Sequence, residues 1–123
     1  MITVSPEKNI QKVKELFSKH AVAFTDFAGA VIAKDNNEVL GYCLYDLTEK
    51  SFTVYEIEPK DDIMLADGIL RSALHIAAER SVMDARYADG APVDLFQKLG
   101  FVKNIDEKML DIDKLFGGCH CGT

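Results

Sequence analysis

The segment from Phe52 to Arg80 constrains the fold most, because it joins a strand pattern to a long helical pattern through Pro59. Apolar and polar residues alternate before the proline, and Pro59 ends the strand because it cannot donate a ladder hydrogen bond. Apolar residues then recur at helical spacing, which predicts a helix from about 62 to 80. Strict alternation places these strand residues on one face: Phe52, Val54, Glu56 and Glu58.

A short strand and an amphipathic helix are predicted at the start of the chain. The strand covers residues 2–4, and Ser5 is the expected N-cap of a helix whose first position is Pro6. Apolar residues recur at helical spacing over residues 10–17. The first helix is therefore expected to bury one face and expose the other.

Strand patterns also occur before and after the long helix in the sequence. Asp35, Asn36 and Asn37 favour a turn, so the strands around them are expected to form a hairpin. Pro92 opens a short last helix, which Gly100 ends as a C-cap. These strands are expected at residues 28–33, 39–45, 82–87 and 109–112.

Length and composition indicate one domain. The 123 residues carry 20 acidic and 14 basic side chains, a net charge of -6, without a basic cluster, which argues against a nucleic-acid partner. No apolar run approaches the ~20 residues that cross a bilayer. The first residues lack a signal-peptide pattern, so a cytoplasmic location is expected. We predict a single domain over residues 1–116 and a flexible tail at 117–123 that contains cysteine and histidine.

The segment LFQKLGF at residues 95–101 is the most specific local motif. It is similar to the Y-x-K-L-G-F segment of the GCN5-related N-acetyltransferases, the GNAT superfamily. The order of predicted elements also resembles that family over nearly the whole chain, in a minimal version. The resemblance implies an α/β (α+β) fold with a mixed, mostly antiparallel central sheet flanked by helices.

The resemblance also implies a coenzyme A site where the third meander strand meets the long helix. Ile57-Glu58-Pro59 matches the V-x-P strand end of the family, and Asp61 to Ala66 aligns with its R/Q-x-x-G-x-G/A cradle. Only Ala66 fits that cradle, because aspartate and methionine replace its first residue and first glycine. Asp61 and Asp62 can instead act as helix caps. The implied contacts of acetyl-CoA, or another acyl-CoA, are Ile57, Glu58, Met64, Leu65 and Ala66.

Acyl transfer to an amine needs a base for the incoming ammonium and an acid for the departing thiolate. By resemblance the base comes from the strand before the cradle, where Glu56 is better placed than Glu58. The family's acid tyrosine corresponds to Phe96, which has no proton to give, and Tyr87 is the nearest substitute. The implied function is transfer of an acetyl or other acyl group to an amine of a small molecule or peptide. A homodimer is an open option.

Two other functions stay open. The departures at Asp61, Met64 and Phe96 favour a GNAT-fold binding or interaction protein that has lost acyl transfer. The tail residues Cys119, His120 and Cys121 could handle a metal or thiols, although their spacing does not make a complete zinc site. His20 and His75 are interpreted as structural. Tyr42 and Tyr45 either line a substrate groove or cover the sheet.

Overall fold

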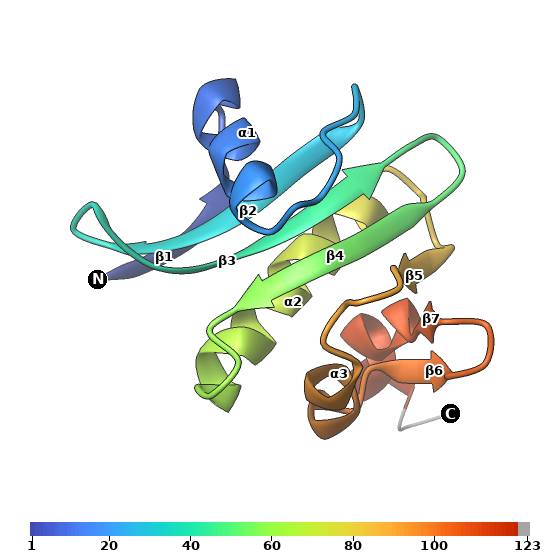
Figure 1. The fold of residues 1–123 in the computed structure, drawn as a ribbon. Coiled ribbons are helices and arrows are strands. Elements are labelled where there is room, and N and C mark those ends of the chain that lie inside the picture. Colours follow the sequence, from blue (N-terminus) through green and yellow to red (C-terminus); the bar gives the residue numbers. More distant parts are fainter. Residues whose placement is uncertain (121–123) are drawn as a thin grey trace.

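The computed structural model describes the backbone of residues 1–120 and the side chains of residues 1–116. Within these residues, helices are interspersed among the strands along the chain (Figure 1). The elements are β1 (Ile2–Pro6), α1 (Ile10–Lys19), β2 (Ala28–Asp35), β3 (Glu38–Leu47), β4 (Phe52–Glu58), α2 (Ile63–Glu79), β5 (Ala85–Tyr87), α3 (Val93–Leu99), β6 (Val102–Asn104), β7 (Met109–Leu110) and a 3₁₀ segment η1 (Ile112–His120).

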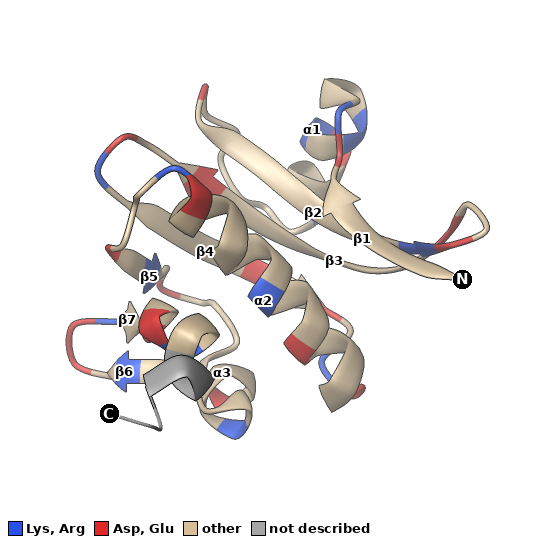
Figure 2. Ribbon diagram, turned by 180° about the vertical axis from the view of Figure 1, so that it is seen from behind, with Lys and Arg blue, Asp and Glu red and all other residues tan. Residues whose placement is uncertain are grey.

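The strands form one seven-stranded sheet in the order β1-β2-β3-β4-β5-β7-β6 within the described residues. Neighbouring strands are antiparallel except for β4 and β5, which run parallel. Helix α1 lies against one face of the sheet and α2 against the other, as Figures 1 and 2 show from opposite sides. This confirms the predicted mixed, mostly antiparallel sheet flanked by helices.

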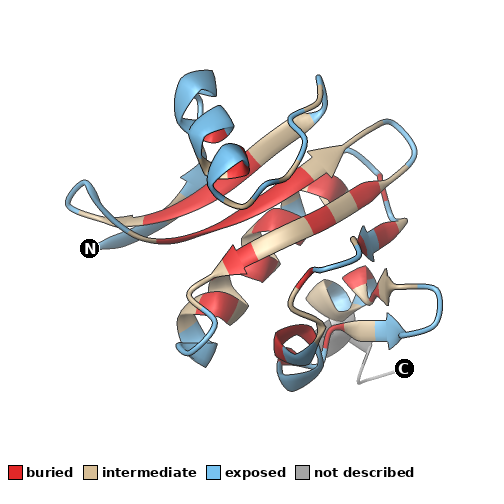
Figure 3. Ribbon diagram, viewed as in Figure 1, coloured by how far each residue is buried: buried red, intermediate tan, exposed pale blue. Residues whose placement is uncertain are grey.

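Each face of the sheet has its own apolar core. On the α1 side, Val13 and Phe17 pack with Leu44 and other strand residues. On the α2 side, a larger cluster joins α2 to β4, β5 and α3. Buried residues therefore follow the middle of β2 and β3 and the inner side of α2 (Figure 3). The outer side of α2 is charged, with an Asp67–Arg71 ion pair at 2.8 Å (Figure 2).

The predicted start of the first helix is wrong. Ser5 and Pro6 belong to β1, where they pair with Ile32 and Val31 of β2. A proline is tolerated there because β1 is an edge strand and needs no outward N–H donor. The helix begins at Ile10, and the side chain of Asn9 caps it by accepting the N–H groups of Gln11 and Lys12.

The long helix agrees with the sequence prediction. α2 covers Ile63–Glu79 with Asp62 as its N-cap, so Gly68 lies inside the helix and not at its start. None of the helices in residues 1–120 is long and apolar enough to cross a membrane.

Gly41 of β3 lies against the turn that joins β4 to α2. A β-carbon at this position would come within 2.7 Å of Pro59 and 2.9 Å of Ile69, and would also meet the Glu58 carbonyl. We expect Gly41→Ala to lower the free energy of unfolding by about 1–3 kcal/mol, because the backbone cannot move aside freely. Urea denaturation measures the change.

Gly68→Ala is the matched control for this prediction. A β-carbon there meets nothing within 4 Å, and the residue is inside a helix. The substitution should raise stability by about 0.5–1 kcal/mol. Equal effects of the two alanines would contradict the close contact at Gly41.

Candidate active site

β4 and β5 pair over only part of their length and then separate. Phe52, Thr53 and Val54 pair with Ala85, Arg86 and Tyr87, and the last contact is a hydrogen bond from the Ala88 N–H to the Val54 carbonyl at 2.9 Å. The chain then turns away toward α3, whereas β4 continues along β3 to Glu58 (Figure 1). The second half of β4 therefore has one side that β5 does not cover.

A β-bulge in β4 changes which residues face α1. Leu44 pairs with Glu56 and Tyr45 pairs with Val54, so Tyr55 is an extra residue in the ladder. Strict alternation therefore fails here, and the prediction that Val54 and Glu56 share one face is wrong. Glu56 and Glu58 lie opposite Leu44 and Tyr42, which belong to the α1-side cluster, whereas Val54 is buried on the α2 side.

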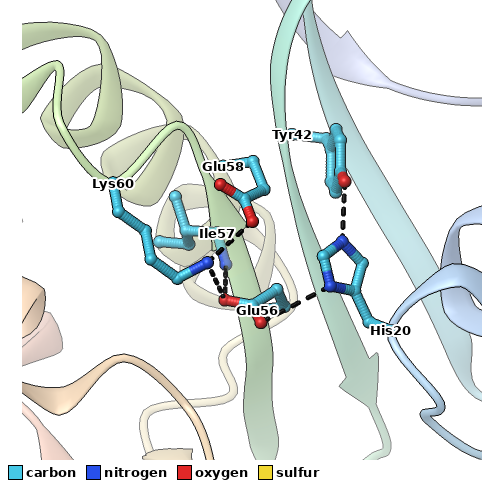
Figure 4. A network of polar contacts seen from close by, with 6 residues as sticks. All are labelled: His20, Tyr42, Glu56, Ile57, Glu58 and Lys60. Atoms are coloured by element: carbon cyan, nitrogen blue, oxygen red, sulfur yellow. Dashed lines mark hydrogen bonds and ion pairs between the residues drawn. The ribbon is translucent and has the colours of Figure 1, made fainter.

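The bulge brings Glu56 into a polar cluster with residues from three segments (Figure 4). His20, just after α1, places Nδ1 3.6 Å from Glu56 Oε2 and Nε2 2.7 Å from the Tyr42 hydroxyl. Lys60 Nζ lies 3.0 Å from Glu56 Oε1 and 2.7 Å from Glu58 Oε2. We name these five side chains the β4 cluster: His20, Tyr42, Glu56, Glu58 and Lys60.

Glu56 also occupies a backbone donor on the open side of β4. Its Oε1 accepts the N–H of Ile57 at 3.1 Å, and the same oxygen accepts from Lys60. The Glu56 side chain is only 15% exposed, so these contacts are largely shielded from bulk water. A carboxylate, an ammonium group and a strand N–H thus meet beside the point where β4 and β5 part.

The charges in the cluster shift the ionisation of two members. Burial raises the pKa of Tyr42, and the carboxylates of Glu58 and Glu56 raise it further. Burial tends to lower the pKa of Lys60, but its hydrogen bonds to Glu58 and Glu56 outweigh burial, and this pKa is raised. Tyr42 is therefore held neutral and Lys60 charged near neutral pH.

The cluster also contains a set of atoms that could chelate a metal ion. One ligand atom each of His20, Glu56 and Glu58 lies within 4.8 Å of the others. The ammonium of Lys60 already lies against both carboxylates, so a metal ion would first have to displace it.

The start of α2 only partly matches a cradle for phosphates. Asp62 Oδ1 accepts the N–H of Leu65 at 3.1 Å, and Ala66 donates to the Asp62 carbonyl. In the described residues, the N–H groups of Ile63 and Met64 have no acceptor. The Met64 side chain is 87% exposed and therefore does not fill the space over these amides.

Two grooves flank this helix start. One of about 790 Å³ lies on the β1 side, and Asp61, Asp62, Met64 and Leu65 contribute to its wall. The other, about 380 Å³, lies on the α3 side, between Lys60 and the residues 91–98. The wall of the second groove carries the basic side chains of Lys60 and Lys98 and the acidic side chain of Asp94.

Tyr87, the proposed acid, and Phe96, at the tyrosine position of the motif, both lie in the core. Tyr87 is almost fully buried, its ring centroid is 5.6 Å from that of Phe96, and its hydroxyl donates to the Ile105 carbonyl at 3.4 Å. Phe96 is fully buried and packs against Tyr87, the last residue of β5. Tyr87 thus stands where β4 and β5 separate, but its hydroxyl points toward the loop after β6.

The structure brings together three residues that the sequence did not single out as a group. His20 was interpreted as structural, Tyr42 had two open roles and Lys60 had none. In the structure His20 and Lys60 contact Glu56, and Tyr42 joins the cluster through His20. His75 is exposed on α2, and Cys43 is fully buried in β3, where burial raises the pKa of its thiol. Side chains of the tail residues Cys119, His120 and Cys121 lie outside the described set.

Comparison with protein-family models and with curated proteins gives no match. A Desulfovibrio desulfuricans protein assigned to the GNAT family of acetyltransferases aligns with a TM-score of 0.55 and 14% identity, over 71% of this chain and 72% of that one. The ribosomal-protein-alanine N-acetyltransferase of Brucella melitensis biovar Abortus 2308 gives 0.55 and 13%, over 81% and 89%.

The E. coli protein YhhK, assigned as an N-acetyltransferase and solved in solution with coenzyme A bound, gives a TM-score of 0.53 and 16% identity, over 85% of this chain and 93% of that one. At identities this low, the likeness concerns the arrangement of helices and strands. The helices and strands of this chain are arranged as in these neighbours, so the chain has the GNAT fold.

Proposed function

We propose that this protein transfers an acetyl group, or another small acyl group, from acyl-CoA to the amine of a small molecule or peptide. One observation carries the proposal: the Ile57 N–H and the Glu56 carboxylate meet on the open side of β4, beside the point where β5 leaves it. A hydrogen-bond donor and a base in one place are two of the groups that acyl transfer to an amine uses.

The cofactor would lie along the open side of β4. The Ile57 N–H would hold the thioester carbonyl in place of Glu56 Oε1, which accepts it in this structure. The amides of Ile63 and Met64 at the start of α2 would face the diphosphate, with Glu58, Leu65 and Ala66 beside the path. Lys98 in the groove on the α3 side supplies positive charge for phosphate, whereas the Lys60 ammonium is already paired with Glu56 and Glu58. Acyl-CoA contributes an activated carbonyl carbon and a thiolate leaving group.

Glu56 is the proposed base. Its carboxylate is shielded, fixed by the Ile57 N–H and in contact with His20. A proton taken from an acceptor ammonium can pass from Glu56 to His20 through that contact, and the Tyr42 hydroxyl fixes the opposite nitrogen of the imidazole ring. The cluster therefore both attracts a cationic amine and provides a route for its proton.

Tyr87 is the proposed acid, and its role is testable on its own. Tyr87→Phe keeps the packing against Phe96 but removes the proton donor. If Tyr87 protonates the leaving thiolate, kcat should fall by about 10²-fold or more. Tyr45→Phe is the matched control, since this tyrosine is similarly buried and packs on Phe52. Equal kcat values for the two variants and the parent would remove Tyr87 from the mechanism.

Calorimetric titration with coenzyme A, followed by an acetyl-transfer assay over a panel of primary amines, tests the function itself. We expect saturable binding and turnover that depends on Glu56. Absence of heat and of thermal stabilisation at saturating coenzyme A would overturn the proposal.

A GNAT-fold binding protein without acyl transfer is the second candidate. Asp62 already caps one amide of the α2 start, and the acid position of the motif is the buried Phe96. Coenzyme A binding without turnover of any amine would favour this second function.

A further inference from the structure

The ammonium of Lys60 lies where an acceptor amine would bind. It contacts Glu56 Oε1 at 3.0 Å and Glu58 Oε2 at 2.7 Å, so two carboxylates hold one primary amine at the edge of the β4 cluster (Figure 4). Glu56 Oε1 also accepts the Ile57 N–H, so the Lys60 nitrogen and the proposed carbonyl-binding N–H share a single acceptor atom.

Lys60 can also reach the side from which the cofactor would come. Its side chain lines the groove on the α3 side, together with Pro92 and Lys98, and it is 43% exposed. The residue follows Pro59 in the short connection before α2, so its position is fixed by the end of β4. Its amine is therefore tethered between the groove and the proposed base.

We propose that Lys60 is a modification site: the protein acylates the Nζ atom of its own Lys60. This inference rests on the proposed function, since acyl-CoA is the donor. It goes beyond that function because it identifies an acceptor within the chain itself.

The reaction balances without any further reagent. Glu56 takes a proton from the Lys60 ammonium, and the neutral amine attacks the thioester carbonyl carbon. A C–N bond forms, the C–S bond breaks, and the departing thiolate of coenzyme A receives a proton. The attacking nitrogen gives up a second proton as the amide forms. The products are an Nε-acyl lysine, free coenzyme A and one proton released to solvent, with no change in oxidation state.

Position, and not intrinsic reactivity, must account for selective reaction at Lys60. The two carboxylates raise the pKa of this ammonium, so less free amine is present than at an ordinary exposed lysine. Exposed lysines such as Lys19, Lys50 and Lys103 should react faster with a thioester in the absence of a site. Faster acylation of Lys60 would therefore report the site directly.

Acylation would also change the β4 cluster. An amide carries no charge, so Glu56 and Glu58 would lose their ion pairs with Lys60. The two carboxylates would then be available to an external ammonium. Self-acylation would thus convert an occupied acceptor position into an open one.

The test is incubation of the full chain with acetyl-CoA, followed by peptide mass spectrometry that gives the rate at each lysine. Coenzyme A binding is measured in parallel by calorimetry. We expect Lys60 to be acetylated at least about tenfold faster than Lys19, Lys50 or Lys103, and Glu56→Gln to lower that rate by about tenfold or more. Glu38→Gln, at an exposed carboxylate outside the cluster, is the matched control.

The urea-unfolded chain gives the rate without a site, and there Lys60 should react like the other lysines. Coenzyme A binding together with uniform acetylation of the folded chain would overturn the assignment of Lys60 while leaving the proposed function intact. Absence of coenzyme A binding would overturn the proposed function itself. A Lys60 rate that Glu56→Gln does not change would also contradict the assignment.

Discussion

Glu56→Gln should lower kcat for acetyl transfer by about 10²–10⁴-fold, the range over which a positioned general base contributes. Glutamine has nearly the same shape, and its side-chain oxygen can still accept the Ile57 N–H that now binds Glu56 at 3.1 Å. The substitution therefore removes basicity and leaves the local geometry close to its original form. Steady-state kinetics with the best amine of the panel measures the effect.

Glu58→Gln separates this role from simple attraction of a cation. Glu58 shares the Lys60 ammonium with Glu56 but does not accept the Ile57 N–H. Its substitution should mainly raise KM for the amine, with a much smaller change in kcat. Full kcat in the Glu56 variant, or equal kcat losses in both variants, would exclude Glu56 as the base.

The second large effect concerns the two aspartates before α2. Replacing Asp61 and Asp62 together by asparagine should tighten coenzyme A binding by about tenfold or more at low salt. A carboxylate ~5 Å from a phosphate charge costs about 3 kcal/mol at an effective dielectric of 20. Because both aspartates are exposed, water and ions reduce this figure. Calorimetric titration at several salt concentrations measures the change in Kd.

Asparagine is chosen because it keeps the helix cap. The Asp62 side chain accepts the Leu65 N–H, and asparagine is an equally good N-cap residue, so thermal stability should be unchanged. The gain in affinity should shrink as salt rises. Asp106→Asn, at an exposed carboxylate between β6 and β7, should leave affinity unaltered. An unchanged Kd in the double variant at low salt would mean that the phosphates do not lie near the α2 start.

Local signals predicted most of the fold. The periodicity of 62–80 and the turn residues after Asp35 define α2 and the hairpin, because each pattern depends on neighbours in the sequence. The start of α1 could not be predicted, because Ser5 and Pro6 also suit an edge strand and the choice depends on pairing with β2.

The candidate site was only half predictable. Glu56 stands out by resemblance, but its partners do not. His20 contacts Glu56 across 36 positions of chain and Tyr42 contacts His20 across 22, and only tertiary structure brings these contacts about. The bulge at Tyr55 leaves no mark in the hydrophobic pattern, so the pattern placed both glutamates on the wrong face.

The bulge at Tyr55 also keeps the charged side chains of β4 out of the apolar interior. In a straight β4, Glu56 and Glu58 would replace Ile57 among the fully buried side chains under α2, and each desolvated carboxylate would cost several kcal/mol. The extra residue avoids this penalty, because the residues after it face the opposite side of the sheet from the one that strict alternation gives. The same thermodynamic preference that keeps charge out of the interior therefore orients the proposed base, without any residue dedicated to that task.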